Sequence, residues 1–210
     1  MENLAIDITP KLSNASKMPC KSFSLEAGDT CPGQYQDGKL DPVCEDCYAQ
    51  KGRYTMPNVR DLRQHNKAAW KSDNFEADMI DLIGNRPYFR WFDSGDCYSL
   101  ELAHKIYRIM RATPNTQHWL PTRMGRFSKF KRVLANMARL DNAVVRHSAF
   151  GYDTRPPRGA KNGSMVNDQK PVPAGVHACP AYATAAGTCR KAKCFACWDK
   201  TVKTIAYPAH

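Results

Sequence analysis

Long apolar segments are absent from this sequence of 210 residues. No stretch approaches the roughly 18 consecutive apolar residues that a membrane-spanning helix requires. The first residues, MENLAIDITPKLSN, have neither the basic nor the apolar region of a secretory signal peptide. These absences argue against a membrane or secreted protein and predict a cytoplasmic protein with no membrane partner.

A shortage of apolar residues, which would indicate a disordered chain, is also absent, although the mean hydropathy is negative. Hydrophobic residues make up 42% of the sequence, and four Trp, nine Tyr and eight Phe can supply a core. The length suits one α/β domain with an appendage. We expect an α/β core with a cysteine loop over residues 1–152, and a coil and cysteine-rich segment packed on it over residues 153–210.

After Pro87, short segments typical of strands alternate with segments whose apolar residues recur at helical spacing. This order predicts strands and amphipathic helices in a βαβαβ arrangement. A shorter strand is expected at residues 21–25, with two helices between residues 59 and 83. Amphipathic crossover helices are typical of a parallel sheet, so we predict an open parallel sheet or a partial (β/α) barrel. The expected strands after Pro87 are 88–92, 118–120 and 143–147, and the expected helices are 100–111 and 127–140.

Nine cysteines are too many for a cytoplasmic protein unless most of them bind metal or perform thiol chemistry. Eight of them form two groups, each containing a C-x2-C pair of the kind that turns two sulfurs toward one ion. The predicted metal ligands are Cys20, Cys31, Cys44 and Cys47 in the first group and Cys179, Cys189, Cys194 and Cys197 in the second. Cys97 is isolated and is expected to be a small buried side chain. His177 and His210 are alternative ligands.

The identity of the metal stays open between iron–sulfur and zinc. The first group follows a predicted strand and has widely spaced cysteines, which favours a [4Fe–4S] cluster. The C-x4-C-x2-C run of the second group suits either zinc or a second cluster. One cluster that draws ligands from both groups is a further alternative.

Polar residues follow two of the predicted strands, at the edge where parallel α/β proteins bind ligands. Two carboxylates and a guanidinium at this edge could position a small anionic or sulfur-bearing substrate. The alternative is that the aspartates cap helices and the arginine only neutralises Asp93. The candidate catalytic residues are Asp93, Asp96 and Arg123, and the candidate cofactor-binding residues are Ser94, Gly95 and Thr122.

The net charge of +11 is compatible with a nucleic acid, a phosphorylated substrate or an acidic partner. Six basic residues between 123 and 139 overlap a predicted helix. They predict either a solvated helix face or a nucleic-acid contact.

Five segments carry a resemblance to a known family: MPCKSFSLEAGDTCPG, VCEDCYAQKGRY, YFRWFDSGD, HWLPTR and CPAYATAAGTCRKAKCFACW. Together they resemble a family of tailed-bacteriophage proteins known by a gene-product number, which is similar in turn to radical-SAM proteins. The resemblance implies a protein of the infected host cell, with a partial barrel and a [4Fe–4S] cluster in the loop after the first strand. The gap from Cys31 to Cys44 is much longer than in the radical-SAM motif C-x3-C-x2-C, which argues against SAM as a ligand.

Two functions are therefore expected from different classes of protein. The first is an iron–sulfur protein that performs radical-SAM-like, redox or sulfur chemistry with a small-molecule substrate or a redox partner. The second is a zinc-stabilised basic module that binds nucleic acid, in which the cysteines are structural.

Overall fold

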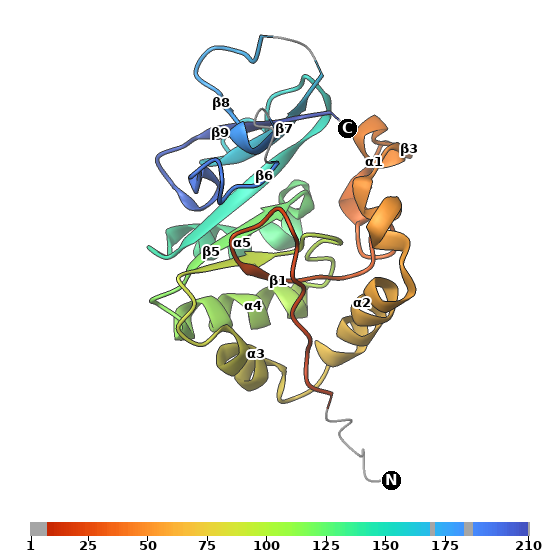
Figure 1. Cartoon of the computed structure of the whole chain (residues 1–210), viewed down its shortest axis with the longest axis vertical. Coiled ribbons are helices and arrows are strands. Elements are labelled where there is room, and N and C mark those ends of the chain that lie inside the picture. The colour runs from red at the N-terminus through yellow and green to blue at the C-terminus, as the bar shows by residue number, and fades with distance from the viewer. Residues whose placement is uncertain (1–7, 169–170, 183–186, 210) are drawn as a thin grey trace.

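Seven strands form one sheet in the order β1-β4-β5-β6-β7-β9-β8, and every neighbouring pair in it is parallel (Figure 1). The computed structural model describes residues 8–168, 171–182 and 187–209. The strands are β1 (Lys21–Phe23), β4 (Tyr88–Trp91), β5 (Gln117–Thr122), β6 (Ala143–Tyr152), β7 (Gly163–Asn167), β8 (His177–Ala178) and β9 (Thr204–Pro208). The predicted parallel α/β sheet is confirmed.

Five α-helices lie in the described part of the chain, and most connect successive strands. They are α1 (Pro42–Glu45), α2 (Pro57–Ala69), α3 (Phe75–Ile83), α4 (Leu100–Ala112) and α5 (Ser128–Arg139). A two-stranded hairpin of β2 (Tyr35–Gln36) and β3 (Lys39–Leu40) precedes α1. None of the helices in the described residues has the length and apolar character needed to cross a bilayer.

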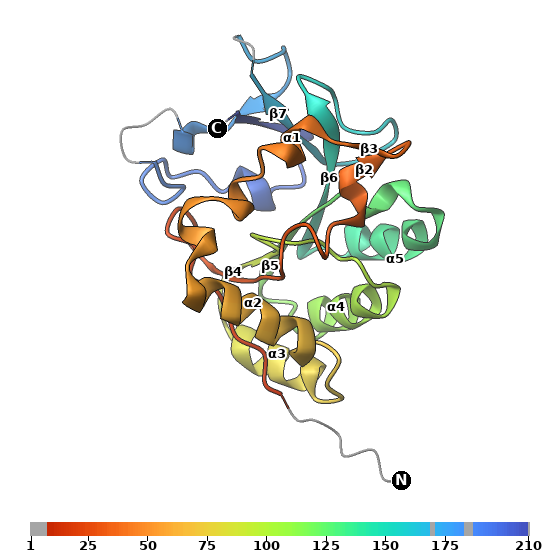
Figure 2. The same ribbon diagram turned by 90° about the vertical axis from the view of Figure 1, so that its right-hand side faces the viewer.

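Helices α3, α4 and α5 cover one face of the sheet (Figure 2). Alternate strand residues such as Phe23, Trp91 and Leu120 point into this core, where apolar side chains of the helices cover them. The apolar spacing of α4 and α5 matches one helix face, as the sequence predicted. This packing fixes the strand ends that carry the candidate site.

His118 on β5 is a polar side chain inside this core and is fully buried. Its Nδ1 accepts a hydrogen bond from Trp91 Nε1 at 3.3 Å, and its Nε2 lies 2.8 Å from the hydroxyl of Thr113. Since that hydroxyl donates to the Ile109 carbonyl, Nε2 carries the proton and His118 is neutral. Burial lowers the pKa of His118 to about 4.

The C-terminal segment covers the opposite face of the sheet. Trp198 and Cys197 pack there against Trp119 of β5 and Ile205 of β9. The indole of Trp198 donates to the Phe89 carbonyl at 2.9 Å. The chain after residue 152 is therefore part of the sheet and of its second core.

Arg146 of β6 ties this segment down from inside the protein, where its side chain is inaccessible to solvent. The guanidinium has no carboxylate partner among the described residues, and it donates to five backbone carbonyls instead. The acceptors are Gly163, Ala196, Cys197, Asp199 and Val202, at distances from 2.6 to 3.4 Å. Burial lowers the pKa of Arg146 from its ordinary value.

Strands β7 and β9 were not predicted from the sequence, which indicated coil after residue 152. Their residues are buried or partly buried, and β9 pairs with β7 along its whole length and with β8 on its other side. The expected boundary at residue 152 falls between β6 and β7, which are hydrogen-bonded neighbours.

Candidate metal and ligand site

The loops that follow β1, β4, β5 and β6 meet at the carboxyl edge of the sheet, as parallel-strand geometry predicts. Asp96, after β4, accepts hydrogen bonds from the Thr122 hydroxyl at 2.7 Å and from the Arg123 backbone N–H at 2.9 Å. It also accepts from the N–H of Cys97 at 2.6 Å. Burial raises the pKa of Asp96. These contacts give Asp96 and Thr122 the role of joining the ends of β4 and β5.

Arg123 joins the end of β5 to the first cysteine loop. Its Nη1 donates to the sulfur of Cys44 at 2.9 Å and forms an ion pair with the fully buried carboxylate of Asp41. The same carboxylate accepts from the N–H of Gly151 at the end of β6. One ion pair therefore connects the cysteine loop to two strand ends.

Two glycines allow these loops to approach closely. A Cβ on Gly33 would lie 2.6 Å from Cβ of Arg123. Gly95 has a φ of +78°, and a Cβ there would lie 2.5 Å from the Thr30 hydroxyl and 2.8 Å from Cβ of Leu25. Gly95 therefore shapes the backbone of the site.

Cys31, Cys44 and Cys47 lie together at this edge, in the loop after β1. The thiols of Cys44 and Cys47 are near enough to Cys31 to contribute to its raised pKa. Burial raises the pKa of Cys31 to about 12, with Asp96 contributing, and that of Cys44 to about 11, although Arg123 opposes the latter shift. Within the described ranges, no set of three or more His, Cys, Asp or Glu side chains already has the geometry to hold a metal ion.

Asp93, just after β4, is almost fully buried, and its hydrogen-bond partners come from β1 and from the segment after Cys47. The hydroxyls of Ser22, at 2.9 Å, and Ser24 donate to Oδ1, and Tyr54 donates to Oδ2 at 3.3 Å. The hydroxyl of Tyr48, next to Cys47, donates to the Asp93 carbonyl at 2.7 Å. Asp93 therefore fastens the segment after Cys47 to β1 and β4.

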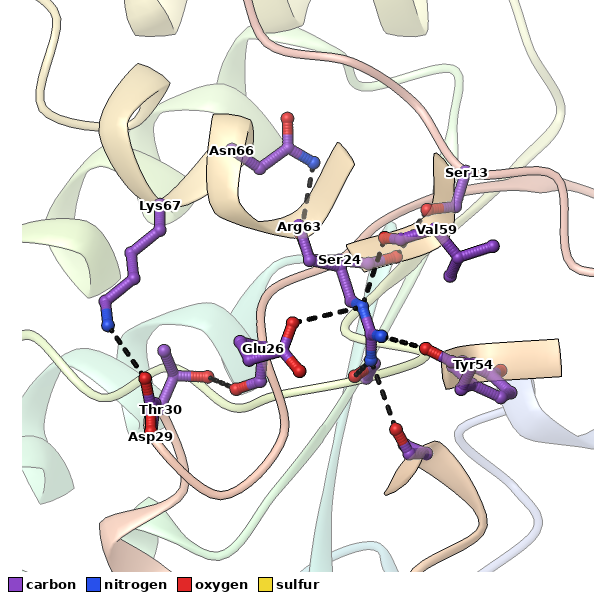
Figure 3. A network of polar contacts seen from close by, with 12 residues as sticks. Ser13, Ser24, Glu26, Asp29, Thr30, Tyr54, Val59, Arg63, Asn66 and Lys67 are labelled. Atoms are coloured by element: carbon purple, nitrogen blue, oxygen red, sulfur yellow. Dashed lines mark hydrogen bonds and ion pairs between the residues drawn. The ribbon is translucent and has the colours of Figure 1, made fainter. Parts of the chain in front are cut away.

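Arg63 of α2 is a central residue that the sequence analysis did not identify (Figure 3). Its side chain is 2% exposed and donates to the carbonyls of Ala49 and Tyr54, to the hydroxyl of Ser94 and to the Val59 carbonyl, and it pairs with Glu26 at 3.4 Å. It thereby holds the loops after β1 and β4 to the segment after Cys47. Its position four residues after Val59, on the buried face of the helix, was the available signal.

Cys20 is the one ligand of the first group that the structure places elsewhere. It packs against the cluster of Trp119, Cys197, Trp198 and Ile205 on the opposite face of the sheet, and the thiols of Cys189 and Cys197 act electrostatically on it. The reason is topological, because Cys20 precedes β1 whereas Cys31 follows it. The four thiols expected in the first group are therefore three.

The second cysteine group lies on the face of the sheet opposite to helices α3 to α5. The thiols of Cys189 and Cys194 contribute to the raised pKa of Cys179, after its burial. The sulfur of Cys194 lies 3.5 Å from Nε2 of His177. His210 lies outside the described residues. Cys97 is fully buried in the helical core, as predicted.

One hollow and one group of basic residues lie away from the cysteines. A hollow of about 480 Å³ opens between the ends of α3 and α4, at the other edge of the sheet. Among the basic residues from 123 to 139, Lys129, Lys131, Arg132 and Arg139 are exposed on α5. This exposed face agrees with the solvated-face interpretation and leaves nucleic-acid contact a prediction.

Comparison with known proteins gives one match. Residues 3–170 match the family described as Gene product 88. No curated protein and no solved structure is significantly similar to the chain. The matched range includes the first cysteine group and ends before the second.

Proposed function

The chain belongs to the Gene product 88 family of bacteriophage proteins, and from its strand-end site we propose that it is an iron–sulfur protein. In this proposal Cys31, Cys44 and Cys47 bind three irons of a [4Fe–4S] cluster at the carboxyl edge of the sheet. The fourth iron takes a small anionic or sulfur-bearing molecule. The observation that carries the proposal is the gathering of three thiols, without Cys20, among the loops that follow β1, β4 and β5.

The donor set fits such a cluster. Thiolates are the usual ligands of iron–sulfur clusters, and three of them leave one iron with an open position. Thiolate ligands adopt their final geometry as they lose protons and bind metal, so the proposal requires neighbouring thiols rather than a completed site. The cluster, when bound, would supply Lewis-acid or redox chemistry at the open iron.

The surrounding residues position the thiols. Arg123 donates to the sulfur of Cys44, and such hydrogen bonds stabilise a thiolate and tune a bound metal. Asp41 holds that guanidinium in place from a fully buried position. Asp93 and Asp96 have partners within the protein for their carboxylate oxygens. We therefore assign positioning roles to Arg123, Asp93 and Asp96, in place of the catalytic roles expected from the sequence.

The sheet order also supports a partial (β/α) barrel with the cluster after its first strand. The spacing from Cys31 to Cys44 contains the β2–β3 hairpin and the start of α1, which no short cluster motif could accommodate. On the basis of this difference we propose a ligand other than SAM at the open iron. Ser94 and Gly95 border the same edge and remain our candidates for contact with that ligand.

The test is anaerobic purification of three proteins, followed by iron and labile-sulfide analysis and by EPR of the reduced state. They are the unaltered chain, the Cys44→Ser/Cys47→Ser double variant and a Cys97→Ser control. We expect the double variant to lose about four irons and four sulfides per chain relative to the unaltered chain, and the control to lose none. Adding a small thiol to the unaltered protein should shift the EPR spectrum, since one iron is open.

Equal iron in the double variant and the unaltered chain would refute the ligand assignment. An EPR spectrum insensitive to added ligands would refute the open iron. Zinc without labile sulfide in this loop would instead support the second candidate, a zinc-stabilised basic module. That candidate further requires nucleic-acid binding that weakens steeply as the salt concentration rises.

A further inference from the structure

The second cysteine group lies on the face of the sheet opposite to helices α3 to α5. Cys20 from the N-terminal segment and Cys179 from the C-terminal segment both pack there against the cluster that contains Cys197 and Trp119. Cys189 and Cys194 act electrostatically on the same group. Thiols from distant parts of the sequence therefore lie near one another on this face of the sheet, although among the described residues no three of them are yet arranged to hold a metal ion.

Backbone hydrogen bonds hold these segments next to one another. The N–H of Cys189 donates to the carbonyl of Lys17 at 3.0 Å, which attaches the C-terminal segment to the residues just before Cys20. The N–H of Cys194 donates to the carbonyl of Cys189 at 3.1 Å, and the N–H of Cys179 to that of Ala206 at 2.9 Å. The backbone of Cys197 is fixed by Arg146. The thiols are thus carried on an ordered frame.

Two buried N–H groups at this place have no acceptor among the described residues. They are Nε of Arg90 and Nε1 of Trp119, and the guanidinium lies 4.4 Å from the centre of the Trp119 ring. Trp119 belongs to the same packed cluster as Cys20 and Cys197, and Arg90 acts electrostatically on both thiols. A buried donor without an acceptor is unfavourable. Metal-bound thiolates or sulfides are acceptors for such groups.

We propose that Cys20 joins the C-terminal cysteines to bind a second metal centre, separate from the Cys31, Cys44 and Cys47 site. Four thiolates complete a tetrahedral zinc site or a [4Fe–4S] cluster, so the centre takes its ligands from both ends of the chain. Arg90 and Trp119 lie at this centre, where a thiolate or sulfide can accept from their free N–H groups. The proposal does not depend on the strand-end cluster.

The test begins with a background chain in which Cys31, Cys44 and Cys47 are all replaced by Ser. After anaerobic purification we expect this chain to retain either about one zinc or about four irons with sulfide, which identifies the metal. Cys20→Ser in this background should lower that metal at least tenfold. Cys20→His should retain it, because imidazole can replace a thiolate ligand, and Cys97→Ser should have no effect.

Circular dichroism of each variant separates loss of metal from loss of fold. Retention of the metal in the Cys20→Ser variant would overturn the ligand role of Cys20. Absence of metal from the background chain, when the unaltered chain contains it, would overturn the second centre. Equal metal in the background and unaltered chains would count against the strand-end cluster alone, so the two proposals fail separately.

Discussion

Replacement of Arg146 by methionine tests how the C-terminal segment is held on the sheet. Methionine keeps much of the apolar volume but removes the guanidinium that donates to five backbone carbonyls. Each bond from a charged donor contributes about 1.5–3 kcal/mol, but these values do not add, and burial of the cation costs several kcal/mol. We expect a net loss of a few kcal/mol, because the substitution leaves buried carbonyls without a donor at about 1–3 kcal/mol each and also removes the cost of burying the cation.

The assay is urea denaturation at pH 7.5, followed by tryptophan fluorescence, because Trp119 and Trp198 report on this face of the sheet. Arg146→Lys should give an intermediate loss, since an ammonium has three donors and cannot match the planar fork of arginine. Arg139→Met is the control, because Arg139 is exposed and donates only to Asn136 among the described residues, and it should change stability by less than about 0.5 kcal/mol. A loss below about 1 kcal/mol for Arg146→Met would refute the reasoning.

Three further predictions follow from buried or strained positions. Burial lowers the pKa of His118 to about 4, below its unfolded value, so the unfolded chain binds the proton at a higher pH than the folded chain does. The free energy of unfolding should therefore fall by about 2 kcal/mol between pH 7.5 and pH 5. His118→Gln should remove that part of the pH dependence in urea titrations. Gly95→Ala should lower the melting temperature more than Gly38→Ala, since both have a positive φ but only Gly95 is enclosed; equal shifts would argue against the close approach. Arg63→Met should cost about 3–5 kcal/mol and reduce iron loading, whereas the exposed Arg60→Met should do neither.

The α/β core was predictable because its signals are local. Strands β4, β5 and β6 and helices α4 and α5 each show their own hydrophobic period, and the structure has them within a few residues of the predicted positions. The shared edge of a parallel sheet then places the loops after residues 92 and 122 together without further information.

Strands β7 and β9 were not predictable in the same way. Their sequences, GSMVN and TIAYP, are short and contain or adjoin residues typical of turns. Their burial comes from pairing with each other and with β6, and such contacts between distant residues leave no periodicity in a single sequence.

Which cysteines lie together also depends on contacts between residues that are distant in the sequence. Spacing linked Cys20 to Cys31, but β1 separates them, so that Cys20 lies on one face of the sheet and Cys31 at its carboxyl edge. Arg63 and Arg146 were overlooked because arginine is mostly exposed in proteins. Only the acceptors assembled by the fold make their burial favourable.

The position of β9 has a consequence for how the chain is made. A ribosome releases β9 after every other strand of the sheet, yet β9 lies between β7 and β8 rather than at the edge. Until it emerges, β7 offers an unpaired flank, and until residues 179–197 emerge the thiol of Cys20 lacks its C-terminal neighbours. Nascent chains should therefore remain open to thiol oxidation until residue 197 emerges and to non-native strand pairing until β9 emerges. Chaperone occupancy and thiol alkylation of stalled ribosome complexes would reveal this interval.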